Sequence, residues 1–306
     1  MTATKQNLFW LKLFGLFSVV RGYNILVIII AQYLASIFIL ASEKSTRSII
    51  LDYKLFLIIF CSSLAIASGY IINNFYDSKK DYINKPIRSS LNKLVSQESR
   101  LHFYFILNIS CCLISWFVSW KATLFFGFYI FLIWLYSHKI KRILIAGNLT
   151  AATLAIFPFF GIFLYFRSLY EVVFYHAAFL FLLILIRELV KDLENIKGDF
   201  ANGYQTIPAV YSVNTSKKVI SILTLLSFIP VFLLIESHTT GFMNYYFYTS
   251  GGLLLLFLVL AFNAKSEKDF WLLHILLKLI IVTGVFSILL INPDVILKSR
   301  IIYLFH

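Results

Sequence analysis

One short polar stretch of this chain places an amide and two carboxylates at a spacing that suits a metal ion. Asn73, Asp77 and Asp81 recur at every fourth position, so on a helix they lie along one face. Like charges one turn apart repel each other, and a cation must compensate for them. Amide and carboxylate oxygens are ligands of Mg²⁺, together with water and substrate phosphates. This first acidic stretch (residues 73–81) therefore predicts a Mg²⁺ site or, alternatively, a solvated helix end neutralised by Lys79 and Lys80.

A basic segment follows the first acidic stretch. Lys85, Pro86 and Arg88 combine a turn fixed by proline with two cations. Lysine and arginine donate strong hydrogen bonds to phosphate oxygens. Carboxylates for a metal followed closely by bases for a phosphate indicate a diphosphate-binding site.

A second acidic stretch (residues 187–199) repeats this chemistry later in the chain. Arg187 and Glu188 are charges near the end of an apolar run, where charges are costly and by default functional. Potential metal ligands recur from there at helical spacing: Glu188, Asp192, Asn195 and Asp199. The alternative is a structural pair of Arg187 with Glu188, followed by a solvated loop. Two such clusters facing each other would clamp one diphosphate through metal ions.

Long apolar runs must position both stretches. The chain is 60% hydrophobic and 13% charged, whereas soluble domains are about 25% charged. It is therefore predicted to be an all-α integral membrane protein, since backbone groups in lipid must satisfy themselves. Nine runs approach the length of a membrane span: residues 22–41, 54–74, 101–120, 122–137, 143–166, 172–191, 218–235, 245–263 and 272–291.

The spans predict one transmembrane domain over residues 1–306. The acidic stretches follow the second and sixth spans, which predicts two pseudo-repeated four-helix units plus one helix around a central cavity. Most of the 27 Lys and Arg residues fall on segments that are cytoplasmic if the N-terminus is inside. Loops 75–100 and 192–217, which carry the motifs, and the cavity opening then face the cytoplasm. The net charge of +13 is explained by anionic lipid, and no nucleic-acid partner is expected.

In their order and spacing these residues resemble the two motifs of the UbiA superfamily of intramembrane prenyltransferases. The first motif matches Asn73, Asn74, Asp77, Asp81, Asn84, Pro86 and Arg88. The second matches Arg187, Glu188, Asp192, Glu194, Asn195, Gly198, Asp199, Gly203, Thr206 and Pro208. Weaker matches are Arg21, Asn24, Tyr136, Ser137, Lys141, Gly147, Asn148 and Lys278. Asn74 and Asn195 stand where the family often has Asp, so each removes a charge and keeps an oxygen.

The resemblance implies Mg²⁺-dependent transfer of a prenyl group from a polyprenyl diphosphate to a lipophilic acceptor, inside a bacterial or archaeal-type cell membrane. It implies a metal set of Asn73, Asp77, Asp81, Glu188, Asp192, Asn195 and Asp199. It implies diphosphate binding by Arg21, Asn24, Arg88, Lys141 and Lys278. The residues expected to be catalytic are Asp77, Asp81, Asp192, Asp199 and Lys141. The acceptor is a prenylglyceryl phosphate, which the form of the second motif favours, or an aromatic quinone precursor.

The sequence also suggests two further roles for individual residues and leaves two other functions as alternatives. The rings of Phe75, Tyr76 and Tyr136 are candidates to stabilise an allylic carbocation, and His138 is a candidate base or a plain interfacial histidine. A transporter would line its path with the intramembrane charges, but it would favour helix breaks at the membrane midplane. A CDP-alcohol-type phosphotransferase would need a tighter aspartate cluster containing glycine and alanine.

Overall fold

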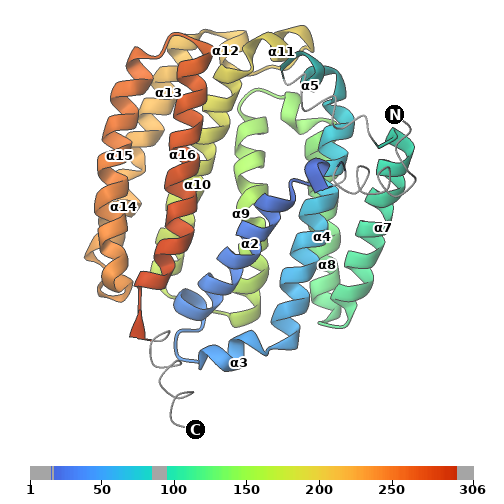
Figure 1. The fold of residues 1–306 in the computed structure, drawn as a ribbon, viewed down its shortest axis with the longest axis vertical. Coiled ribbons are helices and arrows are strands. Elements are labelled where there is room, and N and C mark those ends of the chain that lie inside the picture. Colours follow the sequence, from blue (N-terminus) through green and yellow to red (C-terminus); the bar gives the residue numbers. More distant parts are fainter. Residues whose placement is uncertain (1–14, 16, 85–94, 295–306) are drawn as a thin grey trace, which may run out of the picture.

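A computed structural model of the chain describes residues 15, 17–84 and 95–294, and its regular elements are helices that run side by side (Figure 1). Within those ranges, eight helical segments are long and apolar enough to cross a membrane. They are α2 with η1 (Gly22–Leu40), α4 (Tyr53–Tyr76), α8 with η2 (Trp120–Arg142), α9 (Ala146–Phe166), α10 (Glu171–Glu194), α13 with α14 (Val213–Glu236), η3 with α15 (His238–Asn263) and α16 with η4 (Glu267–Leu290). The predicted all-helical membrane fold is confirmed.

The remaining predicted span, residues 101–120, is helix α7 (Gln97–Trp116). It begins earlier than its apolar run because the Ser96 side chain caps it, accepting a hydrogen bond of 3.1 Å from the Ser99 amide. Its first turn carries Glu98 and Arg100, which lowers its hydropathy. Residues 97–100, which the sequence assigns to the loop 75–100, are therefore the start of this helix.

The side chains form two main hydrophobic cores. The first joins α2, α4, α7, α8 and α9, with Leu55, Ile71 and Phe126 among its most deeply buried members. The second joins α10, α13, α14, α15 and α16 around residues such as Phe247 and Phe257. Many large apolar side chains on the outer surface are exposed, as expected for a bundle that faces lipid. The boundary between the two cores lies where α9 is followed by α10.

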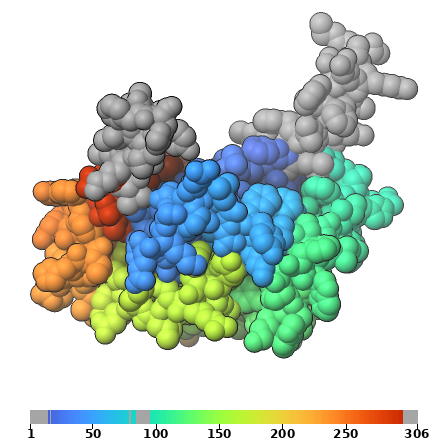
Figure 2. Space-filling model, turned by 90° about the horizontal axis from the view of Figure 1, so that it is seen from below, coloured from blue at the N-terminus to red at the C-terminus, as the bar shows by residue number. Residues whose placement is uncertain are grey.

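Three short helices mark the functional end of the bundle. Helices α5 (Ser78–Asn84), α11 (Ile196–Ala201) and α12 (Ile207–Val210) gather at the top of Figure 1, and α3 (Thr46–Ile50) lies at the bottom. Seen from below, the segment around α3, in blue, lies in the middle of the opposite face (Figure 2). Both acidic stretches therefore lie at one end. That this end is cytoplasmic stays a prediction from the distribution of Lys and Arg.

Candidate active site

A polar cavity of about 90 Å³ at this end of the bundle is lined by both acidic stretches. The carboxylate and amide residues that the two acidic stretches contribute to its walls are Asn73, Asp77, Asp81, Glu188, Asp192 and Asn195. The basic residues on its walls are Arg21, Lys80, Lys141 and Lys191. Four acidic side chains thus face four basic ones, which neutralises the walls while leaving both types of group available to a charged ligand.

The first acidic stretch is held by groups from other parts of the chain. The Lys141 ammonium donates to Asn73 Oδ1 at 2.9 Å and to Asp77 Oδ1 at 2.6 Å. The Tyr204 hydroxyl donates to the same Asp77 oxygen at 2.6 Å. Burial raises the pKa of Asp77, but Lys141 and Tyr204 more than offset it and leave that pKa below its usual value. Asp77 is therefore ionised at neutral pH, whereas the Asp81 carboxylate pairs with no described residue.

Lys141 reaches the cavity because of the turn that precedes α9. It lies in the one-turn helix η2 (Ile140–Arg142), and the backbone then reverses through Ile145, whose φ of 63° is rare for a β-branched residue. Gly147 follows in the first turn of α9. A Cβ on Gly147 would lie 2.9 Å from the Lys141 carbonyl oxygen, so only glycine allows this approach.

The second acidic stretch is neutralised mainly by its own neighbours. Glu188 accepts hydrogen bonds from Arg187, at 3.3 Å, and from Lys191 on the same helix. Asp192 accepts one from the neutral amide of Asn148 in α9 at 2.7 Å. The Asn195 amide nitrogen donates to the Lys191 carbonyl at 2.5 Å. Three of the four predicted metal ligands of this stretch, namely Glu188, Asp192 and Asn195, line the cavity.

The fourth, Asp199, is wholly buried in α11 and forms an ion pair with Lys80 of α5. Its other carboxylate oxygen, Oδ2, has no hydrogen-bond partner in the described part of the chain. Burial raises the pKa of Asp199, and the Lys80 ammonium lowers it only in part. The pair joins the two acidic stretches directly.

Tyr204 is a site residue that the sequence did not single out. Its hydroxyl binds Asp77, and its ring lies 4.3 Å from the Lys80 ammonium and 5.4 Å from the Arg142 guanidinium. The next amide, that of Gln205, donates to the Arg142 carbonyl at 3.1 Å and fixes the loop against η2. The available signal was its position in the tail of the second motif, directly after Gly203.

Some predicted diphosphate-binding residues lie outside the cavity. Arg21 does line it, with its guanidinium 5.0 Å from the Tyr70 ring. Asn24 donates to the Tyr70 hydroxyl at 3.3 Å, and the Lys278 ammonium lies 5.1 Å from the Tyr23 ring. Neither Asn24 nor Lys278 is a wall residue. Arg88 lies outside the described residues.

Of the residues that the sequence suggests for further roles, only some line the cavity. Tyr136 lines the cavity, whereas His138 is exposed and stacks on Trp134 at 5.3 Å. Phe75 and Tyr76 pack against each other rather than form cavity walls. His138 is therefore not placed to act as a base in this cavity.

Two residues of the motifs, Asn74 and Glu194, turn away from the cavity. Asn74 accepts a hydrogen bond from Arg100 of α7, outside the cavity. Glu194 pairs with His274 of α16 at 2.8 Å. Neither side chain is a wall residue.

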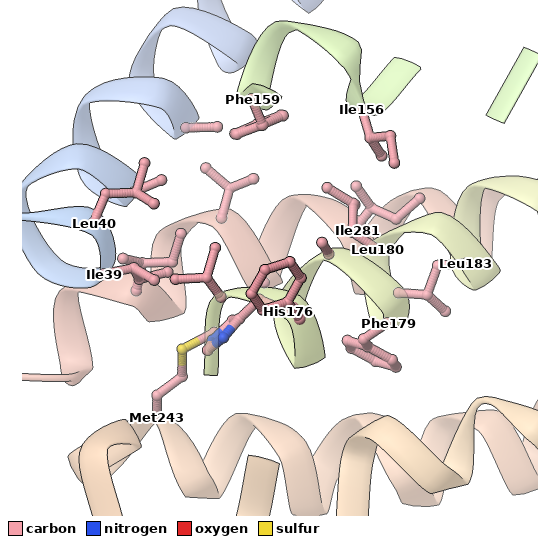
Figure 3. A pocket seen from close by; sticks show the side chains of 18 of the residues that line it. Ile39, Leu40, Ile156, Phe159, His176, Phe179, Leu180, Leu183, Met243 and Ile281 are labelled. Atoms are coloured by element: carbon pink, nitrogen blue, oxygen red, sulfur yellow. The ribbon is translucent and has the colours of Figure 1, made fainter. Parts of the chain in front are cut away.

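An apolar cavity of about 210 Å³ lies deeper in the bundle, between α2, α9, α10, α15 and α16. Figure 3 shows Ile39, Ile156, Leu180 and Ile281 among the side chains around it. Leu183 of α10 borders this cavity, and Glu188 of the polar cavity follows it by about 7.5 Å of helix rise. The two cavities therefore offer a polar and an apolar environment along one helix.

The polar cavity suits a divalent cation that shares its ligands with a substrate. Among the described residues, no three His, Cys, Asp or Glu side chains converge to hold an ion by themselves. Asp81, which pairs with none of the described residues, and Oδ2 of Asp199 are nevertheless groups that attract a cation. Mg²⁺ is commonly held by one or two carboxylates with substrate phosphates and water, so the donor set fits Mg²⁺ bound together with a diphosphate.

Comparisons with known proteins agree with this geometry. The model of the UbiA prenyltransferase family matches residues 26–278. A digeranylgeranylglyceryl phosphate synthase of Thermococcus sibiricus is 34% identical over 54% of this chain, a match that spans only 58% of that relative. One of Sulfurisphaera tokodaii is 28% identical over 71% of this chain and 78% of its own length.

Solved structures show the same fold. A digeranylgeranylglyceryl phosphate synthase structure is similar with a TM-score of 0.69 at 22% identity, covering 90% of this chain and 97% of that one. A UbiA homologue of Archaeoglobus fulgidus bound to DMAPP and Mg²⁺ has a TM-score of 0.61 at 14% identity, covering 90% and 98%. With its eight membrane-length segments, the chain is a multi-pass integral membrane protein.

Proposed function

This chain belongs to the UbiA prenyltransferase family, and on that premise we propose that it transfers a prenyl group from a polyprenyl diphosphate to a prenylglyceryl phosphate. The reaction breaks the C–O bond between the allylic carbon and the diphosphate. It forms an ether with the glycerol hydroxyl and releases diphosphate and a proton. The named relatives, digeranylgeranylglyceryl phosphate synthases, support this acceptor over an aromatic quinone precursor.

One observation carries the proposal: both acidic stretches and four basic residues share one polar cavity, and α10 lines both this cavity and an apolar one. The diphosphate would lie among Arg21, Lys141 and Lys191, whose charges stabilise the leaving group. When bound, Mg²⁺ supplies further positive charge to that leaving group. Asp77, Asp81 and Asp192 belong to the proposed catalytic and metal-binding set, with Asn73, Glu188 and Asn195 as further oxygen donors. Asp199, which pairs with Lys80, belongs to the proposed site as the residue that positions this lysine.

The apolar cavity would hold the prenyl chain of the donor. Its lining is almost entirely hydrocarbon and aromatic, so it keeps water away from an allylic carbocation that water would convert to an alcohol. Tyr136 is one of the two tyrosines on the wall of the polar cavity, the other being Tyr204, and the face of its ring can stabilise that cation. We further propose that residues 1–306 form one domain in the cell membrane, with the N-terminus and the polar cavity on the cytoplasmic side.

The test uses the purified full chain in lipid vesicles with geranylgeranyl diphosphate. Geranylgeranylglyceryl phosphate or 4-hydroxybenzoate serves as acceptor, with Mg²⁺ or with a chelator. We expect diphosphate release and a doubly prenylated glyceryl phosphate, identified by mass, only with Mg²⁺. Turnover of the aromatic acceptor alone would assign the chain to quinone chemistry. Absence of diphosphate release with every acceptor would contradict the proposed reaction.

A further inference from the structure

Lys80 belongs to the first acidic stretch but neutralises the second. It lies in α5, and its side chain crosses to α11, where its ammonium forms the ion pair with Asp199. The ring of Tyr204 lies 4.3 Å from the same ammonium. The Lys80 side chain is only 16% exposed, and it lines the polar cavity. The ammonium is therefore built into the site rather than free in solvent.

We propose that Lys80 is a resident cation of this site, which occupies the place of a second divalent cation at Asp199. On this view the diphosphate is bound by the Lys80 ammonium, which is held by Asp199, and by one divalent cation that is held by wall carboxylates such as Asp81 and Asp192. The inference rests on the proposed function, since it concerns how the same diphosphate is held.

The surroundings of Asp199 favour a permanent partner. A wholly buried carboxylate is costly unless a cation pairs with it. Lys80 is the one ion-pair partner of Asp199 in the ranges that the structure describes. A divalent cation at Asp199 would have to displace the ammonium or lie against it, and like charges at contact distance repel.

Two carboxylates on the cavity wall lack such a partner. Asp81 makes no side-chain hydrogen bond or ion pair with the described residues, and Asp192 is bound by a neutral amide rather than by a cation. These two side chains can therefore attract a divalent cation without displacing a lysine. The contrast assigns the metal to the wall carboxylates that lack a cationic partner and the lysine to Asp199.

The number of hydrogen-bond donors on Lys80 fits this role. An ammonium carries three N–H donors, and Asp199 needs only one of them. The others remain for diphosphate oxygens, with which lysine forms strong charge-assisted hydrogen bonds.

The test counts divalent cations rather than turnover. The purified full chain binds Mn²⁺, used as a paramagnetic probe, in the presence of the unreactive analogue geranyl S-thiolodiphosphate, and bound Mn²⁺ is measured by electron paramagnetic resonance. We expect one Mn²⁺ per chain in the native protein, two in Lys80→Met and one in Lys80→Arg, which keeps the cation. Two in the native protein, or one in a folded Lys80→Met protein, would overturn the inference.

A second variant keeps the inference testable if Lys80→Met does not fold. Asp199→Asn is expected to leave the count at one, because Asp199 holds the lysine and not the metal. A fall to zero would overturn the inference and make Asp199 a metal ligand. No Mn²⁺ in the native protein with the analogue would instead contradict the proposed metal-dependent reaction itself.

Discussion

The two acidic stretches have similar residues but are organised in opposite ways. Asp77 is held by Lys141 and Tyr204, which are 64 and 127 positions away in the chain. Glu188 is held by Arg187 and Lys191, which are one and three positions away on its own helix. Asp77 in the first stretch therefore depends on the assembly of the whole bundle, whereas Glu188 in the second is neutralised as soon as α10 forms.

This difference predicts which substitutions disturb other residues of the site. Removing a group from the first stretch releases partners on η2 and on the loop after α11. Removing Glu188 releases mainly neighbours on α10. Lys80 is the exception that joins the two, since it leaves the first stretch to pair with Asp199.

The largest effect is expected for Asp77→Ala. It removes a carboxylate from the cavity wall and frees Lys141 and Tyr204 from their positions. We expect kcat/KM for diphosphate release to fall by a factor on the order of 10³, comparable to or above the loss of one preorganised charge-stabilising group. Glu267→Ala is the matched control, because this carboxylate is 60% exposed and pairs with Lys197 outside the cavity. Equal activity of the two folded variants would remove Asp77 from the site.

A comparison of two lysines tests the contrast directly. Lys141→Met removes a cation that organises Asn73 and Asp77 from another helix, and we expect a loss of about 10²-fold in kcat/KM. Lys191→Met removes a cation whose partner Glu188 keeps Arg187, and we expect about tenfold or less. Steady-state rates with each protein's melting temperature as folding control provide the measurement. A larger loss for Lys191→Met would reverse the proposed contrast.

The sequence was sufficient for the helices because membrane spans are long apolar runs. It placed the start of α7 too late, because the Ser96 cap extends the helix into polar residues that a search for apolar runs discards. It also predicted one span over residues 218–235, where the structure has two successive helices, α13 and α14. Ser227 separates them, and Pro230 lies in the first turn of α14. Hydropathy therefore does not predict the polar caps and breaks that determine where helices begin and end.

For the site, the sequence identified side chains by spacing but not their partners. Lys80 was considered only as a neutralising charge near Asp77, and its pairing with Asp199 requires α5 to pack on α11. Tyr204 was missed because its contact with Asp77 joins residues 127 positions apart. Such contacts follow from tertiary packing, which helical periodicity does not encode.

Tyr204→Phe tests the smaller contribution of a hydrogen bond within the first stretch. The ring that packs against Lys80 and Arg142 remains, and only the bond of 2.6 Å to Asp77 is lost. A hydrogen bond to a charged group contributes about 1.5 kcal/mol or more, so we expect kcat/KM to fall about tenfold. Tyr211→Phe serves as control, since this tyrosine is exposed and lies outside the cavity. An unchanged kcat/KM for Tyr204→Phe would show that the ring is sufficient and that the hydrogen bond to Asp77 does not contribute to the reaction.

The smallest expected effect is on Mg²⁺ affinity, and it distinguishes the two positions at which asparagine replaces an aspartate that is common in the family. Asn195 lines the polar cavity, whereas Asn74 is turned toward Arg100 outside it. Asn195→Asp adds a carboxylate beside the diphosphate site, and we expect Mg²⁺ to be bound about threefold more tightly, a gain limited by nearby Lys191. Asn74→Asp should leave Mg²⁺ affinity unchanged and strengthen only the contact with Arg100. Titration of Mg²⁺ in the diphosphate-release assay compares the two, and tighter binding in Asn74→Asp would mean that this side chain reaches the metal when substrate is present.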